Sequence, residues 1–176
     1  MAGCAAQSSI KPAEVIDERT GMTVGALRKP IELVQGPENV SASHERISFA
    51  YLGPVEWDNM GDVRNGLWVH LVPGTEWRFV DIRTPGAVTL ILDGEPTALS
   101  AIDPPRLARA PYRPVASWGQ TAYFDLPVQM LKRMASSQII ALDFKADGVP
   151  AVRFDAGRGA RETLVRYLHA RGTTDD

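Results

Sequence analysis

The chain has 176 residues, with 19 basic and 21 acidic side chains and a formal charge of −2. Hydrophobic residues make up 44% and charged residues 23% of it, which is typical of a globular protein and excludes a disordered chain or a protein with several membrane spans. The near-neutral charge lacks the basic excess of a nucleic-acid-binding protein, so we expect no nucleic-acid partner. The single cysteine excludes an internal disulfide framework.

That cysteine stands at the start of the chain, where Ala2-Gly3-Cys4 resembles the lipobox of bacterial lipoproteins. The resemblance implies that the Cys4 thiol carries diacylglycerol and that a signal peptidase cuts before it. Met1 stands where that family has an aliphatic residue, and no apolar segment precedes it. We therefore expect a trimmed signal peptide or a start codon assigned too late. The alternative is a cytosolic protein with an irrelevant exposed thiol.

The lipoprotein interpretation predicts a membrane partner and a location. Residues 1–13 would form the lipidated N-terminus and a flexible tether, because they are mostly small and polar and include a proline. Each buried CH₂ of an acyl chain contributes about 0.8 kcal/mol to membrane affinity. By the sorting rule of such lipoproteins, Ala5 after the cysteine implies anchoring in the outer membrane, facing the periplasm.

A single β-rich domain is expected over 14–172, followed by a frayed tail at 173–176. Apolar residues alternate with polar ones in short runs that are bounded by turn residues, which is the pattern of strands. The expected strands are Thr20 to Leu27, Ile31 to Gln35, Ser43 to Trp57, Leu67 to Val72, Val88 to Leu92, Glu95 to Ile102, Ala116 to Phe124, Ile139 to Phe144 and Ala151 to Phe154. A proline-rich connector is expected from Asp103 to Pro114.

Three tight turns are expected between these strands. Asp93-Gly94 and Asp147-Gly148 separate apolar runs, as in type I′ hairpins, where both central residues have positive φ. The turn of the long hairpin that ends at Val72 is expected at Asn59-Met60-Gly61-Asp62 or at Asn65-Gly66.

Two helices complete the predicted fold. Asp125 is expected to cap the first helix, with Pro127 in its first turn. The second is expected from Ala160 to Arg171, with Gly172 as its stop signal. The first choice of fold is therefore a mainly β, antiparallel β-sandwich, with an immunoglobulin-like form as one variant, a late helix and a C-terminal helix. The alternative is an open antiparallel α+β sheet.

Familiar catalytic and nucleotide-binding motifs are missing from the sequence, so no catalytic residue, metal site or cofactor is predicted. Gly157-Arg158-Gly159 superficially resembles a phosphate loop but is interpreted as a strand-to-helix turn. Asp143 lies within an apolar run, where an inward carboxylate would need a partner, and an edge position facing water is favoured.

Aromatic residues gather in and just after the long hairpin. These candidates for an interaction surface are Tyr51, Trp57, Trp68, His70 and Trp77. A functional interpretation makes Trp68 and His70 part of an aromatic wall for a ligand. The alternative, which is favoured, is a half-buried aromatic cluster with His70 hydrogen-bonded at its rim.

The first 75 residues also resemble a group of uncharacterised proteobacterial envelope lipoproteins. The resemblance rests on Asp-x-x-Thr-Gly-x-Thr from Asp17, on Leu52-Gly53-Pro54 and on Leu67-Trp68. It implies a location in the cell envelope and no particular activity. The leading hypothesis is a non-enzymatic lipoprotein whose domain binds another envelope protein or helps an assembly. The alternatives are a periplasmic small-molecule binder that uses the tryptophan-rich hairpin and, less favoured, a hydrolase.

Overall fold

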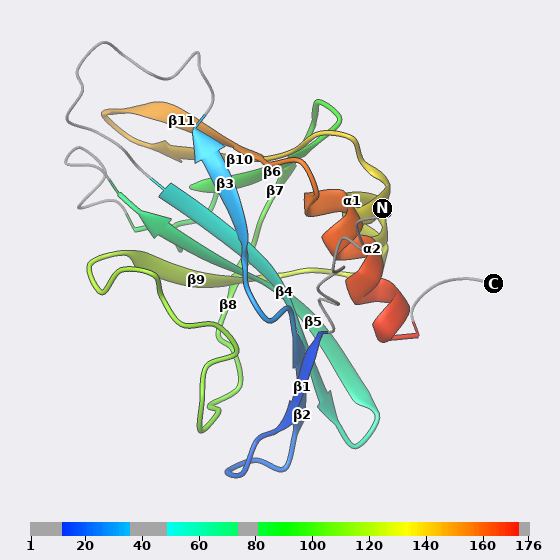
Figure 1. The fold of residues 1–176 in the computed structure, drawn as a ribbon. Helices are drawn as coiled ribbons and strands as arrows, with labels where there is room; N and C mark the ends of the chain where they lie inside the picture. The colour runs from blue at the N-terminus through cyan, green and yellow to red at the C-terminus, as the bar shows by residue number, and fades with distance from the viewer. Residues whose placement is uncertain (1–11, 36–48, 74–80, 173–176) are drawn as a thin grey trace, which may run out of the picture.

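The structure is a computed structural model that describes residues 12–35, 49–73 and 81–172 (Figure 1). Within these ranges eleven strands form one hydrogen-bonded sheet, and all its strand pairs are antiparallel. The elements are β1 (Ala13–Ile16), β2 (Thr23–Ala26), β3 (Ile31–Gln35), β4 (Phe49–Asn59), β5 (Asp62–Val72), β6 (Val88–Leu92), β7 (Glu95–Ala98), β8 (Ala101–Ile102), β9 (Gln120–Asp125), α1 (Val128–Ser136), β10 (Ile140–Ala146), β11 (Val149–Ala156) and α2 (Ala160–Ala170). The predicted mainly β, antiparallel class with a late and a C-terminal helix is confirmed.

The sheet closes on itself. Its strand order is β7-β6-β10-β11-β3-β4-β5-β9-β8, and β2 pairs with the second half of β4 and carries β1. The two ends of this order, β7 and β8, are joined through Leu99 and Ser100. The Leu99 N–H donates to the carbonyl of Val88 (3.1 Å), and the Asp125 N–H donates to the carbonyl of Ser100 (3.0 Å). The layers expected of a sandwich therefore belong to one continuous sheet, because a single bent segment pairs with β6 through β7 and with β9 through β8.

The main core lies on one face of this sheet and against the two helices, which pack against each other. Figure 1 shows the helices together on one side of the sheet. The core side chains below 2% exposure include Leu52, Phe124, Leu142, Phe144, Phe154 and Leu164. The apolar stripes of the helices provide Leu131 and Met134 from α1 and Leu168 from α2. Because alternate strand residues point to one face, the period-two pattern of the sequence produces this core.

Two of the three hairpin turns lie where the sequence predicts them and have the expected positive φ values, and the third differs from the prediction. Asp93 and Gly94 have φ values of 51° and 92°, as a type I′ turn requires. The long hairpin turns at Met60-Gly61, with φ values of 53° and 95°, and the Gly61 N–H donates to the Asp58 carboxylate (2.7 Å). In the third turn Gly148 alone has positive φ, and the strands around it shift register between Phe144 and Ala146. The expected type I′ turn there is therefore wrong, because a bulge changes the strand geometry.

Two local expectations need correction. Asp125 does not cap α1: it is the last residue of β9, and the N-cap of α1 is Pro127, without a side-chain cap. Asp143 is not at an edge, because β10 lies between β6 and β11, and its Oδ1 is buried without a hydrogen-bond partner among the described residues. Pairing with both β6 and β11, which local sequence does not reveal, makes β10 a central strand.

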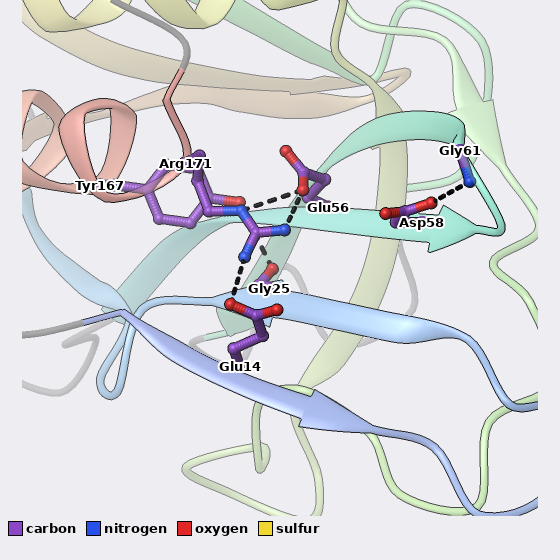
Figure 2. A network of polar contacts seen from close by, with 7 residues as sticks. All are labelled: Glu14, Gly25, Glu56, Asp58, Gly61, Tyr167 and Arg171. Carbon is purple, nitrogen blue, oxygen red and sulfur yellow. Dashed lines mark hydrogen bonds and ion pairs between the residues drawn. The ribbon is translucent and has the colours of Figure 1, made fainter.

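The end of α2 is bound to the sheet by Arg171 (Figure 2). Its guanidinium donates from Nε to Glu56 of β4 (2.9 Å), from Nη2 to the same carboxylate, and from Nη1 to Glu14 of β1 (3.2 Å). Tyr167 adds a hydrogen bond to the carbonyl of Gly25 in β2 (3.3 Å). The last helix thus holds β1 and β2 against β4, and β1 begins at Ala13, the last residue of the predicted tether.

Candidate functional site

Five aromatic side chains lie on the face of β4, β5 and β9 opposite the main core; we call them the aromatic layer. They are Tyr51, Trp57, Trp68, His70 and Tyr123. Strand register brings them together, since Tyr51 is opposite His70 and Trp68 is opposite Tyr123. The rings of Trp68 and His70 are stacked at 5.6 Å, and those of Trp57 and Tyr123 lie 5.8 Å apart.

Part of this layer is closed off from solvent by the connection between β8 and β9, residues 103–119, which we call the covering loop. Tyr112 of this loop is buried and packs on Trp68, with ring centroids 4.9 Å apart. Its hydroxyl donates to the carbonyl of Pro54 (2.8 Å) and accepts from the N–H of Leu27 (2.9 Å). Its ring lies over Gly53, which has no side chain to obstruct it. One phenol therefore joins the loop to β4 and to the residue that follows β2.

His70 is a second attachment point for the covering loop. Its ring is fully buried; Nδ1 lies 2.9 Å from Thr121 Oγ1, and Nε2 accepts a hydrogen bond from the Ala116 N–H (3.5 Å). An accepting Nε2 places the proton of the neutral ring on Nδ1, where it is donated to Thr121. Burial lowers the pKa of His70, which favours this neutral form. The neutral imidazole therefore has a structural role: it hydrogen-bonds both the covering loop and β9.

A third attachment involves Asp17, which is buried just after β1. Its Oδ2 accepts from the Ala108 N–H of the covering loop (2.6 Å), and its Oδ1 accepts from the backbone N–H of Arg19 and from Thr20. Desolvation opposes ionisation, but these hydrogen bonds prevail and lower the pKa of Asp17. The carboxylate therefore stays charged while it holds the loop.

Between these attachments the covering loop exposes two apolar side chains. Trp118 is 68% exposed and Val115 is 58% exposed. The residues around them are held by the bonds from Tyr112 and Ala116 and by Gly119, which lies against the His70 ring. The structure therefore presents a large aromatic side chain to solvent from a loop whose backbone is held at several points.

The predicted interaction residues occupy different places. Trp57, Trp68 and His70 are 1%, 0% and 0% exposed, and Tyr51 is half-buried, so these side chains form an interior layer and not an open wall. Trp77 lies outside the described residues, as does Cys4. The small-molecule binder proposed for the tryptophan-rich hairpin would find neither Trp57 nor Trp68 facing solvent. Trp118 is not among the predicted interaction residues, although an aromatic residue beside a proline-rich connector is a usable signal.

A hydrolase would need His70 or Asp143 beside a second titratable group, and these two residues do not lie beside each other. His70 is in β5 and Asp143 is in β10, and three strands separate these two in the sheet. Gly157-Arg158-Gly159 joins β11 to α2, so its interpretation as a strand-to-helix turn is confirmed. In the described ranges, no three His, Cys, Asp or Glu side chains are grouped to hold a metal ion. None of the described helices is long and apolar enough to cross a membrane.

Comparison of the chain with models of protein families, with curated proteins and with solved structures found no match.

Proposed function

We propose that this chain is a non-enzymatic lipoprotein of the bacterial cell envelope, held in the outer membrane through Cys4, whose β-rich domain binds another envelope protein through the covering loop. The membrane half of the proposal is supported by Ala2-Gly3-Cys4 and the small, polar residues that follow. The binding half is supported by the exposed Trp118 on an anchored loop.

The distance between lipid and domain supports a role close to the membrane. Ala13, where β1 begins, follows Cys4 by only nine residues. Even fully extended, nine residues span about 30 Å. A lipid on Cys4 would therefore keep the domain near the bilayer, within reach of partners in the same membrane.

The single observation that carries the binding proposal is the exposure of Trp118. Tryptophan is enriched among the residues that dominate protein–protein binding energy. A loop already held by Tyr112, His70 and Asp17 loses little conformational freedom on binding, which removes part of the entropic cost of association. Trp118 and Val115 together would form the apolar centre of such an interface.

Lipidation is tested on the protein extracted from cell membranes. Mass spectrometry should find diacylglycerol and an amide-linked acyl chain on an N-terminal Cys4, and globomycin should cause the uncleaved precursor to accumulate. Cys4→Ala is the control, and it should carry no acyl group and remain uncleaved. An unmodified Cys4 in a washable, soluble protein would overturn the membrane half of the proposal.

Partner binding is tested by placing a photo-crosslinking amino acid at position 118 in living cells. A discrete adduct with an envelope protein is expected, and Val115→Ser should weaken it. The matched control is the same probe at Met60, which is apolar and fully exposed on another loop. Equal adducts from both positions, or none from position 118, would contradict the binding half.

A further inference from the structure

A surface hollow lies between the start of β3 and the start of α2, away from the covering loop. Its volume is about 670 Å³. Three of its lining residues are basic and exposed: Arg28, Lys29 and Arg158. One lining residue, Glu32, is acidic, so the hollow has a net positive charge although the whole chain is negative.

The hollow lies at the end of the domain where the tether enters. Strand register pairs Ala13, the first residue of β1, with Ala26, the last residue of β2. Arg28 and Lys29 follow Ala26 by two and three residues. A chain arriving from a lipid on Cys4 therefore joins the fold directly beside two of the three cations, and Figure 1 shows the start of β1 at the connection between β2 and β3.

We propose that this hollow binds the phosphate group of an anionic phospholipid at the membrane surface. This inference rests on the proposed lipid anchor, which brings this end of the domain to the bilayer. Arginine and lysine are the side chains suited to phosphate, arginine by paired N–H groups and lysine by its compact charge. Their attraction to an anionic bilayer acts only within about a Debye length, and the predicted tether is flexible enough in composition to let this end of the domain approach that closely.

Apolar residues in the same hollow favour a lipid over a free phosphate ion. Pro30 and Ile31 line it, and Val34 on its rim is 62% exposed. A free ion makes no use of such surface, whereas the glycerol and first methylene groups of a phospholipid do.

The test uses the full chain with Cys4→Ser, so that no acyl anchor contributes. Its co-sedimentation is measured with vesicles of phosphatidylglycerol and phosphatidylcholine and with vesicles of phosphatidylcholine alone. Binding to the anionic vesicles only is expected, and the triple variant Arg28→Gln, Lys29→Gln, Arg158→Gln should lower the partition coefficient about tenfold or more. The matched control neutralises Arg106, Arg109 and Arg113, three exposed arginines of the covering loop, and changes the net charge equally.

Each outcome decides the proposal. The proposal is supported if the triple variant in the hollow greatly lowers vesicle binding while the triple variant in the covering loop changes it little. Equal losses from both would show attraction by net charge alone and would overturn it, as would no vesicle binding. Millimolar inorganic phosphate that saturates the hollow in NMR titrations without displacing vesicles would also overturn it. Because Cys4→Ser lacks the anchor, these results are independent of lipidation: acylated Cys4 with no vesicle binding leaves the proposed function standing alone.

Discussion

The ring of Tyr112 lies directly on the backbone of Gly53, where an added Cβ would fall 2.4 Å from Tyr112 Cζ. A separation below 3 Å between two carbon atoms is a steric clash, so this contact requires glycine. It joins a strand of the sheet to the covering loop that presents Trp118. The order of the proposed binding loop therefore depends on a residue buried beneath it.

Gly53→Ala is expected to destabilise the protein by roughly 1–3 kcal/mol, the usual cost of overpacking an interior contact. Tyr112 would have to move and give up its hydrogen bonds to Pro54 and Leu27. Urea unfolding measures the change. Gly157→Ala is the matched control, because a Cβ there meets no atom within 4 Å. If both substitutions lowered the free energy of unfolding equally, the close contact between Tyr112 and Gly53 would be contradicted.

Tyr112→Phe separates the hydrogen bonds of the phenol from the packing of its ring. The N–H of Leu27 and the carbonyl of Pro54 would both lose a buried partner. A buried polar group left unpaired costs about 1–3 kcal/mol, so a loss in that range is expected in urea unfolding. Hydrogen exchange should also become faster at the amide of Leu27 while Leu33, in the sheet, stays protected. Unchanged exchange at Leu27 would show that its N–H has another partner.

Lowering the pH should reduce the stability of the folded protein, because His70 is buried in its neutral form. Burial lowers the folded-state pKa of His70 below its ordinary value of 6.5. In the unfolded chain the His70 imidazole is therefore protonated near pH 6.5, whereas in the folded chain it stays neutral at that pH. The free energy of unfolding should fall as the pH drops through 6.5, by at most about 1.4 kcal/mol per pH unit, until the folded state itself is protonated.

The measurement compares urea unfolding at about pH 8 and about pH 5, within the range where histidine titrates. His70→Gln should have a smaller loss of stability between these pH values than the natural chain. His169→Gln, at an exposed histidine on α2, should retain the full loss. If His70→Gln keeps the whole pH dependence, His70 is not its source.

Arg171→Ala should destabilise the protein by roughly 1–3 kcal/mol. The Arg171 side chain is 9% exposed and that of Glu56 is 13% exposed, so removing the cation leaves a carboxylate largely shielded from water. Arg83→Ala is the control: Arg83 pairs with Asp103 at 2.7 Å, but both side chains are mostly exposed, so little change is expected. Thermal unfolding distinguishes them, and a similar small shift for both would show that burial adds nothing to the Arg171 pair.

Local signals predicted most elements well. β3 has the predicted bounds of Ile31–Gln35, and α2 ends one residue before the predicted Arg171. The hairpin at Asp93-Gly94 has the expected turn, because both the turn and the alternation around it are encoded within a few residues. The strand β1 was missed, since its four residues are largely exposed and depend on pairing with β2.

The candidate site was predicted only in part. Period-two alternation correctly placed Trp68 and His70 on the same face of a strand. Whether that face was open depended on residues 103–119, which lie more than thirty positions later in the chain. The contacts of Tyr112 with Gly53 and of Ala116 with His70 close it.

The sequence by itself determined the antiparallel β class, the two helices and the tight turn at Asp93-Gly94, because these depend on residues close together along the chain. Tertiary structure alone decided that the sheet closes through Leu99 and Ser100, that Trp68 is buried while Trp118 is exposed, and that Arg28 and Arg158 share a hollow. These features depend on contacts between segments that are far apart in the sequence. Such contacts result from the packing of the whole chain, so the hydrophobic periodicity of any one segment does not reveal them.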